Sequence, residues 1–143
     1  MKAEISLESY FEIDLEFLMP GTRWQIDNKA DLGNLAEQYV LEFLLSREFR
    51  KVAVNYRERP YGEVDLIVKN DQTHYFIEVK ARRNSGEEML ESIVTPRQYA
   101  RLLNAAELYS ARNNVSVRIC LALLSIQDEA QGSRLSLRFL PLA

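Results

Sequence analysis

The fold is decided by the stretch Gly62-Glu63-Val64-Asp65-Leu66-Ile67-Val68, followed shortly by Phe76-Ile77-Glu78-Val79-Lys80. The two stretches predict a β-hairpin whose strands are joined by Asn70-Asp71-Gln72-Thr73. Side chains alternate along a strand, and residues opposite each other in an antiparallel pair point to the same side. One face of the hairpin is therefore apolar and carries Val64, Leu66, Val68, Tyr75, Ile77 and Val79. The other face carries Glu63, Asp65, Glu78 and Lys80.

The acidic face of this hairpin needs a compensating charge. Depending on the length of the turn, Glu78 lies opposite Asp65 or opposite Glu63, and like charges placed opposite each other destabilise a sheet. A divalent cation would neutralise them. A solvated outer face of a hairpin can show the same alternation, but three carboxylates with one lysine favour a functional site.

Length and composition indicate one domain with a substantial core, because the chain has 143 residues of which 47% are hydrophobic. The single cysteine, Cys120, excludes an internal disulfide framework and lies in an apolar run that predicts a buried thiol. No apolar run is long enough to span a bilayer, and the N-terminus does not resemble a signal peptide. We therefore expect a cytoplasmic protein with no membrane partner.

The charge is unevenly distributed along the chain. A net charge of −3 is not typical of nucleic-acid-binding proteins, but residues 1–28 hold six acidic and only two basic residues. This predicts an acidic N-terminal arm before a single domain at 29–143. Within the arm, residues 10–17 alternate apolar and acidic side chains, which favours an extra strand, although a helix also fits. Near the hairpin, basic residues predict either a rim that attracts phosphates or ordinary solvated surface: Arg57, Arg59, Lys80, Arg82, Arg83, Arg97 and Arg101.

The rest of the sequence predicts helices and strands in a definite order. Asp31 or Asn34 would cap a helix ending near Arg47, and Thr95-Pro96 would open a second helix ending near Asn113. Strands are predicted at 52–56, at 115–126 as a central strand, and at 135–139 at an edge, with a polar loop at 84–88. The order is helix, three strands, helix, two strands. It predicts an α/β fold with a mixed β-sheet, because a helical crossover brings two strands side by side in parallel.

Several motifs carry a resemblance to a known family. Asp65 followed by Glu78-Val79-Lys80 resembles the Asp…Asp/Glu-x-Lys motif of restriction-endonuclease-like, or PD-(D/E)xK, nucleases. Further motifs occur in the order seen in the YraN family, a small bacterial group of endonucleases: Gly33-x-x-Ala36-Glu37, Asn55-Tyr56-Arg57, the two hairpin stretches with Ala81-Arg82, and Val94-Thr95-Pro96-Arg97. The likeness covers roughly residues 29–125. It departs at Gln98, where the family usually has lysine, and at Cys120, where it often has aspartate.

The resemblance implies a three-layer restriction-endonuclease-like core and a metal-dependent nuclease that cleaves DNA, including branched or single-stranded DNA. Mg²⁺ or Mn²⁺ prefers oxygen ligands, so we expect Asp65 and Glu78 to bind the metal. The resemblance adds the backbone carbonyl of Val79 as a ligand and Glu37 as a catalytic carboxylate, unless Glu37 is an ordinary surface residue. Lys80 would position water or stabilise the transition state. Glu63 is either an outer ligand of the metal or a solvated strand residue.

DNA is the expected partner, contacted by a set of side chains around the hairpin: Arg57, Arg82, Arg83, Arg97, Gln98 and Arg101. Two other functions stay open. Gln98 and the acidic arm suggest a catalytically inactive nucleic-acid-binding module on the same fold. Alternatively, residues 10–17 could pair with the strand of a protein partner or of a second copy, which would make a homodimer.

Overall fold

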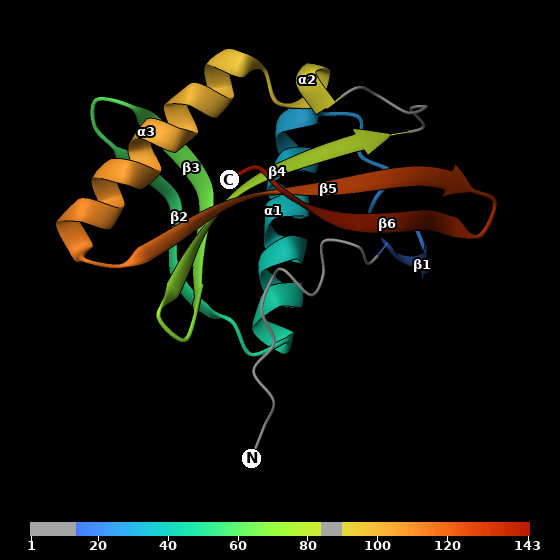
Figure 1. Ribbon diagram of the computed structural model, residues 1–143. Helices are drawn as coiled ribbons and strands as arrows, with labels where there is room; N and C mark the ends of the chain where they lie inside the picture. The colour runs from blue at the N-terminus through green and yellow to red at the C-terminus, as the bar shows by residue number, and fades with distance from the viewer. Residues whose placement is uncertain (1–13, 84–89) are drawn as a thin grey trace.

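The computed structural model of the chain describes residues 14–83 and 90–143 (Figure 1). Its elements, in chain order, are β1 Asp14–Pro20, α1 Lys29–Ser46, β2 Arg50–Glu58, β3 Gly62–Asn70, β4 Thr73–Arg83, α2 Leu90–Ile93, α3 Pro96–Asn113, β5 Ser116–Glu129 and β6 Gly132–Pro141. The predicted polar loop at 84–88 lies outside the described residues, as do residues 10–13 of the first predicted strand.

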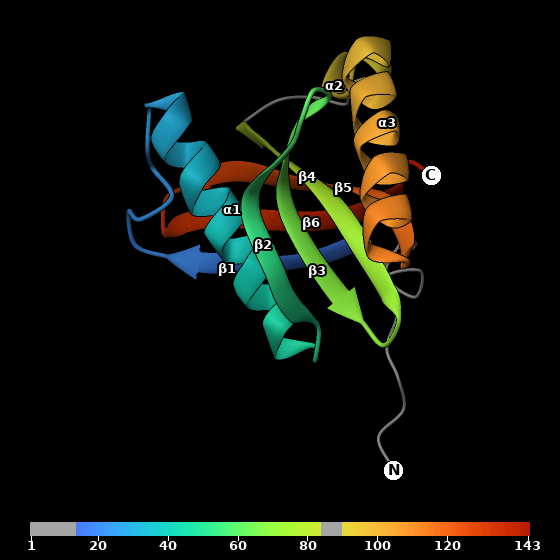
Figure 2. The same cartoon turned by 90° about the vertical axis from the view of Figure 1, so that its left-hand side faces the viewer.

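The strands form one mixed sheet in the order β1-β6-β5-β4-β3-β2. β4 and β5 are parallel, and the other neighbouring strands are antiparallel. α3 makes the crossover between the parallel pair, and Figure 2 shows α1 and α3 on opposite sides of the sheet. The predicted three-layer α/β core is confirmed, and so is the central position of the strand after the second helix.

The sequence predicted the last strand at an edge of the sheet, and this prediction was wrong. β1 pairs antiparallel with β6 and lies outside it. The register runs from Asp14↔Arg138 to Pro20↔Gly132. β6 buries Leu135, Leu137 and Phe139 completely, and β1 occupies the outer edge of its backbone. The strand predicted in the arm is therefore confirmed over its described part, and it is an integral strand of the sheet.

The ends of the two long helices follow from local hydrogen bonds. Asn28, and not Asp31 or Asn34, caps α1, because its side-chain oxygen accepts hydrogen bonds from the backbone N–H groups of Ala30 and Asp31 at 2.9 and 3.1 Å. The predicted start of α3 is confirmed, with Thr95 as its cap. α3 ends at Asn114, whose φ of 52° is left-handed.

Each helix covers one face of the sheet with its own hydrophobic cluster. α1 buries a stripe at four-residue spacing, Leu32, Ala36, Val40 and Leu44, against the side chains of β4, β5 and β6. α3 buries Leu102, Ala105, Ala106 and Tyr109 against the opposite face. The hairpin of β3 and β4 therefore lies between two packed layers, which hold its open end in a fixed position.

Candidate functional site

The backbone pairing of β3 with β4 ends just before the acidic residues Asp65 and Glu78. The β3–β4 ladder runs from Asn70↔Thr73 to Leu66↔Ile77, so Asp65 and Glu78 are the next residues on the two strands. There, Asp65 Oδ2 accepts a hydrogen bond of 2.8 Å from the backbone N–H of Val79. In a regular ladder a backbone carbonyl would accept the hydrogen bond from Val79 N–H. Here the Asp65 carboxylate accepts it, and this bond holds the Asp65 side chain between the two strands.

Val64 faces the α3 side, together with Ile67 and Leu102, and not the same side as Leu66. The sequence prediction was wrong at this position because β3 does not alternate regularly past Asp65. Its neighbour β2 is irregular at the same level, where Asn55 has a left-handed φ of 48°. Asparagine tolerates this conformation better than most residues.

Asp65 interacts with two glutamates, Glu37 of α1 and Glu78 of β4. Burial, together with the negative charge and hydrogen bonding of Asp65, raises the pKa of Glu78 to about 8, against the lowering effect of Lys80. Burial and the same aspartate, with a smaller effect of Glu63, raise the pKa of Glu37 to about 7. The fold thus places two glutamates beside Asp65 in surroundings that disfavour the negative charge of Glu37 and Glu78.

Lys80 supplies a positive charge beside these carboxylates. Its Nζ lies 3.6 Å from Glu78 Oε1, and the two side chains are only 22% and 18% exposed. Within residues 14–83 and 90–143, no three Asp, Glu, His or Cys side chains form a complete metal-binding group.

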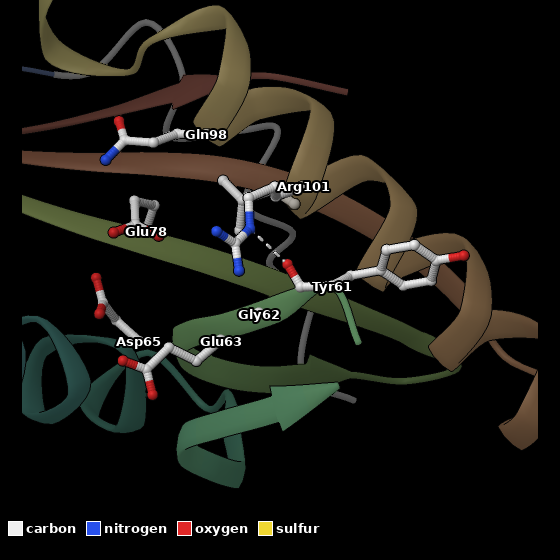
Figure 3. Close-up of a pocket in the computed structure, with 8 residues that line it drawn as sticks. Tyr61, Gly62, Glu63, Asp65, Glu78, Gln98 and Arg101 are labelled. Carbon is white, nitrogen blue, oxygen red and sulfur yellow. Dashed lines mark hydrogen bonds between the residues drawn. The ribbon is translucent and has the colours of Figure 1, made fainter. Parts of the chain in front are cut away.

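Asp65 and Glu78 line a cleft of about 340 Å³ between the hairpin and α3 (Figure 3). The other residues that line it are Tyr61, Gly62, Glu63, Gln98, Arg101 and Leu102. Tyr61, Gly62 and Leu102 were not predicted as site residues. A signal for Leu102 existed, because residues 98, 101 and 102 have the spacing of one helix face.

Arg101 lies across the start of β3 because residue 62 has no side chain. A Cβ at Gly62 would come within 2.9 Å of Arg101 Nη2, and Gly62 has a φ of 125°, which favours glycine. Arg101 Nε donates a hydrogen bond of 2.8 Å to the carbonyl of Tyr61, drawn in Figure 3. The remaining guanidinium nitrogens lie at the cleft.

A second cleft of about 350 Å³ adjoins the first and is lined by Arg57, Arg59 and Arg101, among others. The structure thus brings Arg57 and Arg101 to one surface. Glu63 lines both clefts and forms an exposed ion pair of 3.2 Å with Arg57.

Gln98 has a local structural task. Its Oε1 accepts a hydrogen bond from the N–H of Thr95, and its own N–H donates to Thr95 Oγ1, at 3.1 and 3.2 Å. This capping box requires an acceptor side chain, which a lysine cannot supply. Arg97 is exposed in the same first turn of α3 and does not line the cleft of Asp65 and Glu78.

The two arginines at the end of β4 differ in their surroundings. Arg82 Nη1 donates to the carbonyl of Ala81 at 3.0 Å. Arg83 is turned inward, where it pairs with Asp128 at 3.1 Å and donates to the carbonyl of Trp24. Arg83 therefore ties the N-terminal segment to the sheet, a structural task that the sequence did not indicate.

The fold and the site together define an α/β protein with a carboxylate and lysine cluster at the open end of a β-hairpin. The model of the uncharacterised protein family UPF0102 matches residues 36–126. The chain belongs to this family, which is the YraN family that the sequence motifs indicated. The matched region includes Glu37, Asp65, Glu78 and Lys80.

Similar proteins carry the same family name. The UPF0102 protein of Dictyoglomus turgidum is 32% identical over 115 residues, which are 80% of this chain and 97% of that protein. The UPF0102 protein of Francisella tularensis subsp. novicida is 35% identical over 83 residues, or 58% and 71% of the two chains. Among solved structures, Pyrococcus furiosus SfsA in complex with Ca²⁺ is similar with a TM-score of 0.38 and 12% identity, over 78% of this chain and 62% of that chain. Within the described part of this chain, no helix is long and apolar enough to cross a membrane.

Proposed function

We propose that this protein is a metal-dependent nuclease that hydrolyses phosphodiester bonds of DNA. The observation that carries the proposal is the fixed Asp65 carboxylate, hydrogen-bonded to Val79 N–H at 2.8 Å, beside Glu78 and its neighbour Lys80. Carboxylates that line a cleft, with a lysine beside them, are groups that metal-assisted hydrolysis can use. Family membership adds support, because the resemblance first drawn from the motifs implies the same chemistry.

The residues present fit Mg²⁺ or Mn²⁺. Asp65 and Glu78 would hold the ion, with the backbone carbonyl of Val79 as a further oxygen ligand. The raised pKa of Glu78 supports this assignment, because a cation would neutralise the charge that the site disfavours. When bound, the ion would supply an activated water and stabilise negative charge on the phosphate.

The other side chains have roles that follow from their positions. Lys80 can hold the attacking water or stabilise the developing charge, because its ammonium lies next to Glu78. Arg101 and the amide nitrogen of Gln98 provide donors for phosphate oxygens along the cleft. Glu37 can accept a proton near the reacting atoms, since its pKa is raised to about 7.

The alternative of a protein-interaction domain that uses the arm depends on one edge of β1. The described part of residues 10–17 is paired with β6 along one edge of its backbone. Because β1 is the outermost strand of the sheet, the strand of a partner would have to pair with its opposite edge.

A comparison of two matched variants tests the proposal. Asp65→Asn removes the charge but keeps an oxygen that can accept the Val79 N–H, while Asp71→Asn makes the same change at the exposed tip of the hairpin. Labelled single-stranded, duplex and branched DNA would be incubated with Mg²⁺ or Mn²⁺, and the products separated on a denaturing gel.

We expect cleavage by the wild type and by Asp71→Asn, and none by Asp65→Asn or in the presence of EDTA. Salt-sensitive binding with no cleavage by the wild type would contradict the proposal. It would instead identify an inactive nucleic-acid-binding module.

A further inference from the structure

A third cavity, of about 550 Å³, lies on the α1 side of β4. Four basic residues and one acidic residue line it, namely Lys29, Lys80, Arg82, Arg83 and Asp27. Lys80 connects this cavity to the carboxylates, because its Nζ is 3.6 Å from Glu78 in the cleft on the α3 side. The proposed catalytic groups therefore lie between this basic cavity and the arginine-lined cleft of Arg57 and Arg101.

Gly33 keeps this cavity open. It lies inside α1, one turn before Glu37, where glycine is less favourable than alanine. A Cβ at this position would meet no atom within 4 Å, and its backbone conformation is not one that requires glycine. Neither packing nor backbone geometry within the described chain explains this glycine. A ligand that approaches the helix closely would explain it, because any side chain would occupy the same space.

We propose that this cavity is a phosphate-binding subsite for the DNA strand next to the scissile bond. The inference rests on the proposed function, since it takes DNA as the substrate. Lys29 and Arg82 bind the oxygens of a neighbouring phosphate, for which a guanidinium is well suited. Gly33 lets the sugar-phosphate chain lie close to α1. Arg83, which also lines the cavity, is held in place by Trp24 and Asp128 and adds positive charge to it.

The arrangement defines what the substrate must be. A strand that occupies both the α1 cavity and the cleft of Arg57 and Arg101 extends in both directions from the bond to be cleaved. The protein therefore recognises a continuous polynucleotide strand, and a dinucleotide fills only part of the binding surface.

The test measures DNA binding in the Asp65→Asn background, so that cleavage does not interfere. Lys29→Gln, Arg82→Gln and Gly33→Leu would be compared with Lys51→Gln, which removes an exposed lysine from edge strand β2. Fluorescence anisotropy would give dissociation constants for a labelled oligonucleotide long enough to span both cavities and for a dinucleotide. Thermal unfolding of each variant, including Gly33→Ala, would serve as the folding control.

We expect Lys29→Gln and Arg82→Gln each to weaken binding of the long strand roughly 3- to 10-fold, with a smaller salt dependence. Lys51→Gln should bind like the parent protein. Gly33→Leu should also weaken binding, and Gly33→Ala should unfold at a higher temperature than the parent because the added methyl group meets free space. None of these variants should change binding of the dinucleotide as strongly.

Unchanged binding of the long strand by Lys29→Gln, Arg82→Gln and Gly33→Leu would overturn the inference. If the wild-type protein still cleaved DNA in a manner that depends on Asp65, the proposed function would survive that result. In contrast, the wild type could bind DNA without ever cleaving it while these variants bind it more weakly. That result would contradict the nuclease activity and support the phosphate-binding subsite.

Discussion

Asp65 and Glu78 concentrate negative charge at a point where the polypeptide provides little compensation. Asp65 receives one hydrogen bond from Val79, and Glu78 is offset in part by Lys80. At the scale of single residues the site is therefore costly to keep ionised. This cost leads to predictions about stability that do not depend on measuring cleavage.

The metal-free protein should lose stability as the pH rises from about 5 to about 8. The folded-state pKa values of Glu37 and Glu78, about 7 and about 8, exceed the ordinary value of 4.5. Between these values the folded protein holds more protons than the unfolded chain, so the free energy of unfolding falls with rising pH. Glu78→Gln should remove much of this loss. Thermal unfolding in EDTA at several pH values would measure this loss of stability, with the exposed Glu107→Gln variant as the control. If stability fell equally with pH in both variants, the raised pKa of Glu78 would be contradicted.

Mn²⁺ or Mg²⁺ should restore the stability lost at the higher pH. A ligand that binds only the folded state at about 100 times its dissociation constant adds about 2.7 kcal/mol. We expect a higher unfolding temperature for the wild type and for Asp71→Asn, and a much smaller shift for Asp65→Asn. Differential scanning calorimetry would provide the measurement, and an equal shift in all three proteins would place the ion elsewhere.

At the scale of elements, the start of α3 joins stability to recognition. Thr95 caps the helix and Gln98 completes the capping box, while the Gln98 side chain also lines the cleft of Asp65 and Glu78. One residue thus serves both the end of a helix and the wall of the candidate site. Local capping accounts for glutamine at the position where the motif usually has lysine.

Gln98→Lys should change stability and binding in opposite directions. It removes the acceptor for Thr95 N–H, which should lower the free energy of unfolding by about 0.5–1 kcal/mol. It also adds a positive charge to the cleft, which should tighten DNA binding. Urea unfolding and anisotropy would measure the two effects, with Thr95→Ala as a variant that loses stability without adding charge. Tighter binding by Thr95→Ala as well would contradict the electrostatic explanation.

At the scale of the whole molecule, the N-terminal segment completes the sheet. β1 covers the outer edge of β6, and Trp24 is 2% exposed. Trp24 packs edge-on against Tyr39 of α1 at a centroid distance of 5.6 Å. Through Arg83, the same segment is tied to the end of β4 that carries Lys80. The described part of the acidic arm therefore contacts both α1 and the end of β4.

Removal of residues 1–20 should lower the unfolding temperature and promote association, because it exposes the backbone edge of β6. Trp24 is the single tryptophan and is buried, so its fluorescence reports unfolding in both proteins. Light scattering would detect the association. An unchanged unfolding temperature and a monodisperse truncated protein would show that β1 contributes nothing to the sheet.

The sequence by itself determined the elements whose signals are local. The alternation at 62–68 and 76–80 fixed the hairpin, Thr95-Pro96 fixed the start of α3, and the apolar run with Cys120 indicated the central strand. These signals are sufficient because they come from periodicity and capping within a few residues. The same periodicity placed Asp65 and Glu78 on one face, but it left open whether Asp65 or Glu63 lies opposite Glu78.

Tertiary structure alone decided the features that depend on residues far apart in the chain. The interior position of β6 required β1, more than a hundred residues away. The inward turn of Arg83 required Trp24 and Asp128, and Val64 packs on the α3 side with Leu102, which lies far from it in the chain. No local pattern encodes such contacts, because each one is favourable only after the chain has brought distant segments together.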